Sequence, residues 1–230
     1  DTGGNARLSL IEYYQNSSGK NYHTNHTINV SKSLYGDASH NVNLTETNNT
    51  QLTYSLELGC GEISEDITFS PTTVSVNGSC FTVGTDDLVI DGAGLTIVGN
   101  TSGAGVNVTG YNNISFSNFK IHNFSEGVYL GATNNTYCYD SLINNSANQD
   151  IYANNGAGMN NTFINVTFDR SSTSVGTNSD IYVQWYVDIS VINNGFIVSD
   201  ANVSGYNVSG SLEQSNITNA DGEARLILTN

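Results

Sequence analysis

The chain has 230 residues, enough for one large domain or two smaller ones with a real hydrophobic core. Only 12% of the residues are charged, yet the net charge is −15, because 21 acidic residues face 6 Lys and Arg. Six basic side chains argue against nucleic acids and anionic lipids as partners. No apolar run approaches the ~18 residues of a membrane-spanning helix, so membrane insertion is not expected. Asp1 begins no signal peptide, so any targeting segment should be absent or already removed.

The N-terminal flank, residues 1–57, contains three segments with the alternating pattern of half-buried β-strands. They run from Ala6 to Tyr14, from His26 to Lys32 and from Asn41 to Leu56. His23 and His26 lie in a loop between two of them, and two histidines alone are too few to hold a metal ion.

Three cysteines follow this flank. Cys60 and Cys80 bracket a short pair of strands, and we expect a disulfide between them that closes a loop of about 20 residues and contributes ~3 kcal/mol. Cys138 alternates with Tyr137 and Tyr139 and is interpreted as a small buried hydrophobe. Because no Cys-x-x-Cys pair or Cys/His cluster is present, we expect no metal site and no cofactor.

The middle of the chain repeats on a short period. Pairs of Asp or Asn residues precede strand-like segments at intervals of 26, 22 and 26 residues: Asp86-Asp87, Asn112-Asn113, Asn134-Asn135 and Asn160-Asn161. A second set of short strands precedes the last three pairs. Two or three strands in a period of this length fit one coil of a parallel β-helix. Stacked Asn pairs can form hydrogen-bonded ladders at one corner, and Asn tolerates the left-handed backbone that such corners need.

This repeat resembles the right-handed parallel β-helix of the NosD-like and pectate-lyase-like superfamily over about residues 59 to 184. The segment Leu88–Ile97 is similar to the opening coil of many such domains, and Cys60 and Cys80 fall in a capping section found in some archaeal surface members. The resemblance implies a fold and leaves the function open, because the same solenoid occurs in lyases, hydrolases and inert spacers. The copper association of the family name is not carried over, because the chain has no cluster of ligands.

The C-terminal flank, residues 185–230, is a series of short alternating strands and turns. The strands are Trp185–Ile192, Phe196–Val198, Ala201–Val208, Ser215–Thr218 and Ala224–Leu228. They resemble the first half of an immunoglobulin-like or carboxypeptidase-regulatory-like β-sandwich, which is too small to bury a core alone. The flank 1–57 resembles the missing second half. We therefore predict an all-β chain with a parallel β-helix over residues 58–184 and a sandwich half at each end.

The two ends of the chain echo each other. Gly4–Leu10 aligns with Gly222–Leu228 at an offset of 218 residues, with five of seven positions identical. This indicates that the chain is about one period of a repeating protein, cut inside a domain. Identical copies would then join head to tail, either as covalent tandem repeats or by strand complementation between chains. The strands expected to assemble centre on six residues: Ala6, Leu8, Leu10, Ala224, Leu226 and Leu228.

Asn-x-Ser/Thr sequons are about twice as frequent as the composition predicts. They occur at Asn16, Asn25, Asn29, Asn43, Asn48, Asn77, Asn100, Asn107, Asn113, Asn123, Asn134, Asn144, Asn160, Asn165, Asn202, Asn207 and Asn216. Asn-rich turns beside Thr-rich strands would produce some of them by accident. The functional interpretation is a densely N-glycosylated extracellular surface on which glycans solvate a face with few charges.

A polysaccharide lyase or glycoside hydrolase is the main alternative function, and hydrolysis would need two carboxylates about 5–10 Å apart. The solenoid acids are Asp86, Asp87, Asp91, Glu126, Asp140, Asp150 and Asp169. Most fall at turns, and the pair Asp169-Arg170 is interpreted as an exposed ion pair. Calcium at Asp221–Glu223 stays open, as does a carbohydrate-binding module that uses exposed Tyr and Trp185.

The sequence therefore predicts a structural protein of the cell surface or cell envelope without catalysis. It resembles the large repetitive surface proteins of archaea. The expected assembly is a sheath, S-layer, filament or adhesin stalk, and the expected partners are identical copies and N-linked glycans.

Overall fold

The computed structural model describes residues 5–44, 51–154, 156 and 158–229. It forms two compact units, Asp1–Leu58 and Gly59–Asn230. Among the described residues the only helix is a 3-10 turn at Arg170–Ser172, and the rest of the regular structure is β-strand. The predicted all-β class is confirmed.

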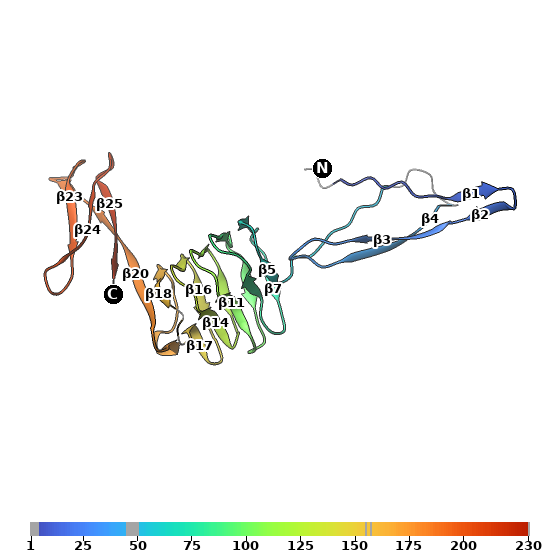
Figure 1. Cartoon of the computed structure of the whole chain (residues 1–230). Helices are drawn as coiled ribbons and strands as arrows, with labels where there is room; N and C mark the ends of the chain where they lie inside the picture. Colours follow the sequence, from blue (N-terminus) through green and yellow to red (C-terminus); the bar gives the residue numbers. More distant parts are fainter. Residues whose placement is uncertain (1–4, 45–50, 155, 157, 230) are drawn as a thin grey trace. The chain divides into compact units, whose positions relative to one another are not determined.

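The larger unit begins with a parallel β-solenoid, whose coils stack side by side in Figure 1. Three sheets run along it, and neighbouring strands in each come from successive coils. The first contains β5 (Gly61–Ile63), β8 (Phe81–Val83), β11 (Ala104–Thr109), β14 (Glu126–Gly131), β17 (Gln149–Ala153) and β19 (Thr173–Val175). The second contains β6 (Ile67–Thr68), β9 (Val89–Asp91), β12 (Ser115–Ser117), β15 (Tyr137–Tyr139), β18 (Gly158–Ile164) and β20 (Ser179–Ser190). The third contains β7 (Thr73–Ser75), β10 (Thr96–Val98), β13 (Lys120–His122) and β16 (Leu142–Asn144). The predicted parallel β-helix is confirmed.

The core of the solenoid is built from one inward residue in each short strand. In the three-residue strands β12 and β15 the central Phe116 and Cys138 are fully buried, while their neighbours face outward. This is the alternation that a pleated strand imposes. Ile97, Ile121 and Ile143 form an equivalent inner row in the third sheet, each at 0% exposure. Each inner side chain thus packs on the coils before and after its own.

The Asn pairs form the predicted ladder at the corner that precedes the second sheet. The side-chain Nδ2 of Asn113 donates to Asp87 Oδ1 at 2.9 Å, and Nδ2 of Asn135 donates to Asn113 Oδ1 at 3.1 Å. Asp87, Asn113 and Asn135 all have a left-handed backbone, with φ between 55° and 60°. The ladder therefore satisfies the polar groups of a turn that few other residues could adopt.

β20 leaves the solenoid and continues into the C-terminal strands (Figure 1). Its residues 179–184 pair with β18 in parallel, and its residues 184–190 pair antiparallel with β25 (Glu223–Thr229). Two hairpins lie between these strands in the sequence: β21 (Ile192–Asn193) with β22 (Phe196–Ile197), and β23 (Asn202–Tyr206) with β24 (Leu212–Ile217). The expected strands are present here, whereas their membership of an immunoglobulin-like sandwich stays a prediction.

The smaller unit contains two hairpins. β1 (Tyr13–Asn16) pairs with β2 (Gly19–Tyr22), and β3 (Asn25–Val30) pairs with β4 (Ala38–Asn43). The strand expected from Ala6 begins only at Tyr13, and the strand expected up to Leu56 ends at Asn43; residues 45–50 lie outside the described part. Segments 5–11 and 51–57 alternate correctly, but no neighbouring strand forms a ladder with them, so these two expectations were wrong for the chain alone. The division of the chain at residues 57/58 and 184/185 stays a prediction.

Candidate assembly interface

The predicted assembly strand at the C-terminus has one apolar face. In the antiparallel pair, Trp185 lies opposite Leu228, Val187 opposite Leu226, and Ile189 opposite Ala224. Residues directly opposite each other in such a pair share a face of the sheet. Leu226 is 2% exposed and Ala224 is 6% exposed.

This apolar face packs against the hairpin β23–β24. A Cβ atom added to Gly205 in β23 would lie 2.7 Å from Leu228 Cδ2 and 3.2 Å from Leu226 Cδ1. The absence of a side chain at Gly205 therefore allows the two strand pairs to approach closely. The C-terminal strands form a two-layered arrangement with Leu226 in the middle.

The opposite face of β25 carries an ion pair. Arg225 donates from Nε to Asp188 Oδ1 at 2.7 Å and from Nη2 to Asp188 Oδ2 at 3.0 Å, and its guanidinium lies 4.5 Å from the ring centroid of Tyr186. The hydrogen bonds from Arg225 lower the pKa of Asp188 and, in return, raise the pKa of Arg225. Both side chains are more than half exposed. The pair therefore fixes register more than it adds stability.

Side chains of β24 cover the outer edge of β25. Asn216 Nδ2 donates to the carbonyl oxygen of Arg225 at 3.1 Å, and the backbone N–H of Ile227 donates to Gln214 Oε1. An uncovered strand edge is a template for pairing with other chains. β25 is thus hydrogen-bonded to β20 on one edge and shielded by amide side chains on the other.

The echo segment at the N-terminus has the opposite environment. Residues 5–11 form no strand, and Leu8, Leu10 and Ile11 are 65%, 38% and 64% exposed. By the alignment, Leu8 corresponds to Leu226. Nearly identical segments are thus packed at one end of the chain and unpacked at the other. The structure places the two predicted assembly strands in different units and does not pair them.

The smaller unit has no core of its own. None of its described residues is buried. The pair β3–β4 is nevertheless amphipathic: Ile28, Val30 and Val42 lie on one face, while Thr27 Oγ1 donates to Asn41 Oδ1 at 2.8 Å on the other. An amphipathic hairpin needs a further layer to bury its apolar face. The described part of this unit does not supply one.

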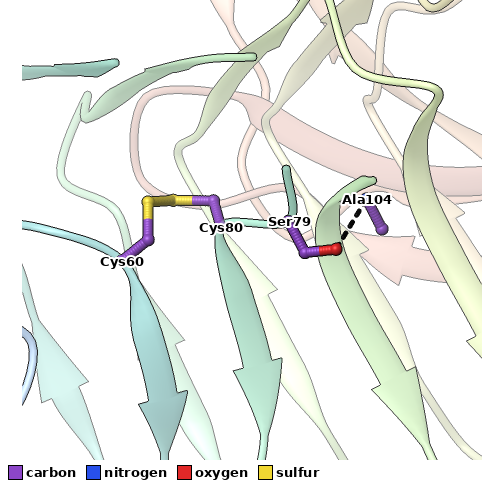
Figure 2. The surroundings of a disulfide bond; sticks show 4 residues. All are labelled: Cys60, Ser79, Cys80 and Ala104. Atoms are coloured by element: carbon purple, nitrogen blue, oxygen red, sulfur yellow. Dashed lines mark hydrogen bonds between the residues drawn. A yellow bond between two sulfur atoms is a disulfide. The ribbon is translucent and has the colours of Figure 1, made fainter. Parts of the chain in front are cut away.

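The predicted disulfide is present. Cys60 precedes β5 and Cys80 precedes β8, and Figure 2 shows the sulfur bridge between these neighbouring strands of the first sheet. The adjacent Ser79 Oγ accepts a hydrogen bond from the Ala104 N–H at 3.1 Å, which ties the same corner to the next coil. Cys138 is fully buried, and burial raises the pKa of its thiol, so it acts as a small core side chain.

The sequons lie at the surface. Asn48 falls outside the described residues, and none of the sixteen other sequon asparagines is buried. Four are half-buried (Asn43, Asn107, Asn144, Asn165), and the others are exposed: Asn16, Asn25, Asn29, Asn77, Asn100, Asn113, Asn123, Asn134, Asn160, Asn202, Asn207 and Asn216. Their glycosylation stays a prediction.

The carboxylates considered for catalysis make hydrogen bonds within turns. Asp91 accepts from Asn118 Nδ2 at 2.9 Å and from the Ala93 N–H at 2.8 Å, and these bonds lower its pKa. Asp169 caps the 3-10 turn by accepting from the Ser171 N–H at 2.9 Å, and the Ser171 hydroxyl and amide lower its pKa. In the ranges that the structure describes, no three His, Cys, Asp or Glu residues lie close enough to hold a metal ion.

A second ladder went unrecognised in the sequence. It contains Asp91 with Asn118, and Asp140 with Asn165, whose Nδ2 donates to Asp140 Oδ1 at 2.6 Å. The intervals between these residues match those of the Asn pairs, and this periodicity was the signal that could have revealed it. His26, by contrast, uses its ring: Nε2 lies 2.7 Å from the carbonyl oxygen of His23.

Comparisons with known proteins add no relative. No family model, no curated protein and no solved structure matches the chain. No helix among the described residues is long and apolar enough to span a bilayer.

Proposed function

We propose that the chain is a structural, extracellular repeat unit that joins identical copies head to tail. The observation that carries this proposal is the contrast between the two echo segments, since Leu226 is 2% exposed and the equivalent Leu8 is 65% exposed. A segment that is core in one place and solvent-exposed in the other is explained if it completes a neighbouring copy.

The register of the join follows from β25. Residues 4–10 of one copy take the place of residues 222–228 of the copy before it, so Arg7 occupies the position of Arg225 beside Asp188 and Tyr186. Residues that follow in the same copy then bring the apolar face of β3–β4 to the half-formed sandwich. The join is a peptide bond in a tandem protein and a set of strand hydrogen bonds between free subunits.

The extracellular assignment is supported by the disulfide and the sequons. A disulfide persists in oxidising compartments, and N-linked glycans would solvate a surface that has few charges. A solenoid provides a stiff spacer without an active site. A sheath, S-layer, filament or adhesin stalk, like those of archaeal surfaces, would use such a unit.

A chain of two periods, residues 1–230 followed by residues 13–230, tests the proposal. Hydrogen exchange in the segment 25–43 is measured in the single and in the double chain. We expect that about half of this segment gains protection in the double chain, because only the second copy has a preceding half-sandwich to pack on. Equal exchange in both chains would contradict the proposal.

A substitution at the junction supplies the matched control. Leu226→Asp in the first copy should abolish the new protection, because it places a charge in the apolar layer of the join. The same substitution in the second copy leaves the junction intact and should preserve it. Light scattering of single chains then separates the two versions: assembly that rises with concentration supports strand exchange, and a monomer at every concentration leaves only the covalent repeat.

A second candidate function is carbohydrate binding. Tyr137 and Tyr139 project outward from β15, with ring planes at 12° and centroids 6.1 Å apart. Parallel aromatic rings with polar rims suit sugar rings. Loss of retention on a neutral polysaccharide column in Tyr137→Ala, with retention unchanged in Tyr206→Ala, would support it.

A further inference from the structure

One corner of the solenoid carries a sequon in four successive coils. The sequons follow the strands of the third sheet, β7, β10, β13 and β16, and begin at Asn77, Asn100, Asn123 and Asn144. The strand register places Ser75 beside Val98, Val98 beside His122, and His122 beside Asn144, so the four asparagines stack to within one residue. We name these four positions the sequon ridge.

Backbone hydrogen bonds hold neighbouring coils together at the ridge itself. Val76 N–H donates to the Val98 carbonyl at 3.0 Å, and Gly99 N–H donates to the His122 carbonyl at 2.8 Å. Asn100 also contacts the coil before it, because its Oδ1 accepts from the Gly78 N–H at 3.3 Å. The ridge asparagines are therefore separated by a single strand spacing of ~4.8 Å.

The ridge asparagines present their amide nitrogens to solvent. Asn77, Asn100 and Asn123 are exposed, and no described residue accepts a hydrogen bond from their Nδ2 atoms. In Asn100-Thr-Ser102 the serine hydroxyl donates to the asparagine Oδ1 at 2.5 Å, so the two functional groups of the sequon already lie together.

The sequons in the two ladders are different. Nδ2 of Asn113 donates to Asp87 at 2.9 Å, and Nδ2 of Asn165 donates to Asp140 at 2.6 Å. At Asn134 the hydroxyl residue of the sequon, Thr136, is 1% exposed. In these sequons either the acceptor nitrogen or the hydroxyl is already engaged in the fold.

We propose that the sequon ridge is the glycan-bearing edge of the folded solenoid, and that glycans on neighbouring coils of the ridge exclude each other. A substituted sugar ring is wider than the ~4.8 Å between coils, so a glycan on one coil covers the amide of the next. One molecule then carries at most two ridge glycans, on coils that are not adjacent. This inference rests on the extracellular, glycosylated part of the proposed function and is independent of head-to-tail assembly.

The modification needs an activated sugar donor, a lipid-linked oligosaccharyl diphosphate. A bond forms between the asparagine Nδ2 and the anomeric carbon, and the bond from that carbon to the phosphate oxygen breaks. The lipid diphosphate leaves with the electron pair, and the amide nitrogen loses one proton. An oligosaccharyltransferase supplies the base, so the chain contributes only the accessible amide and the hydroxyl of the sequon.

The test glycosylates the folded chain. The unglycosylated, disulfide-bonded protein is treated with a purified oligosaccharyltransferase and its lipid-linked donor, and each sequon is quantified by glycopeptide mass spectrometry. Peptides from a digest of the same chain, treated in parallel, give the intrinsic reactivity of each sequon. We expect Asn77, Asn100 and Asn123 to keep their reactivity in the folded chain and Asn113, Asn134 and Asn165 to lose it. Ladder sequons that react as fully as the ridge would overturn the proposal.

Mutual exclusion is tested by removing one ridge position. Asn100→Gln should raise the occupancy of Asn77 and Asn123, by up to about two-fold, because each then loses a competing neighbour one coil away. Asn202→Gln, in the hairpin β23–β24, is the matched control and should change neither. Peptides with glycans on both Asn77 and Asn100 should be absent from the folded chain.

Abundant doubly modified peptides, or an unchanged occupancy in Asn100→Gln, would refute exclusion. These outcomes are distinct from the failure of assembly, which the hydrogen-exchange comparison of single and double chains measures without any glycan.

Discussion

Leu226 and Leu8 form a pair of matched positions, because they are equivalent in the echo and differ in burial. Leu226→Ala removes three carbon groups from a side chain that is 2% exposed. At about 0.8 kcal/mol for each group, the transfer cost alone is ~2.4 kcal/mol, and an unfilled cavity adds to it. We therefore expect Leu226→Ala to lower the free energy of unfolding of the C-terminal strands by about 2.5–3 kcal/mol. Leu8→Ala in the single chain should change it by less than about 0.5 kcal/mol.

The only tryptophan of the chain is the probe for this measurement. Trp185 lies opposite Leu228 in the β20–β25 pair, so its fluorescence reports the unfolding of these strands. Urea titrations give the midpoint and the slope for each variant, and a change in midpoint at constant slope measures stability. A loss for Leu8→Ala as large as for Leu226→Ala, or no loss for Leu226→Ala, would refute the burial argument.

Three further predictions concern the solenoid. Cys60→Ser removes the disulfide that joins the first two coils and should cost ~3 kcal/mol, seen as a lower midpoint of thermal unfolding that reductant no longer changes. Gly127→Ala should destabilise by about 1–3 kcal/mol in the same assay, because the new Cβ would lie 2.2 Å from Ile143 Cγ2. Asp91 has a lowered pKa in the fold, so its ionised form adds stability above the ordinary carboxyl pKa of about 3.9, and this is lost as the pH falls through the folded value. Asp91→Asn should therefore flatten the stability profile below about pH 4, whereas an unchanged profile would mean that its bond to Asn118 adds nothing.

The solenoid could be predicted from the sequence because its determinants repeat. Each coil places an apolar residue at the centre of a short strand and an Asn or Asp at the corner, and the interval between Asn112 and Asn134 is visible without a structure. The second ladder was missed because Asp91 and Asn118 differ in type, so only their spacing connects them. The cysteine pair was predictable because both residues flank short strands one coil apart.

The flanks were harder to predict for a physical reason. The alternation from Ala6 to Tyr14 indicates which side chains would share a face, but a strand also needs a neighbour for its backbone groups. That neighbour is specified by tertiary packing, and β25 already holds the matching edge of β20. The alternation was therefore read correctly at Leu226 and wrongly at Leu8, although the two sequences are nearly the same.

The continuous course of β20 also fixes a rotational phase. Gln184 lies opposite Ile164 of β18 and also opposite Thr229 of β25, so no linker separates the solenoid from the strands that follow it. The orientation between them is set by one backbone, whose side chains alternate with a period of two. Inserting a single residue after Gln184 would turn Trp185 and Val187 to the face of Arg225. The length of this strand, counted in residues, therefore acts as the gauge that sets the angle between successive units of any polymer built from it.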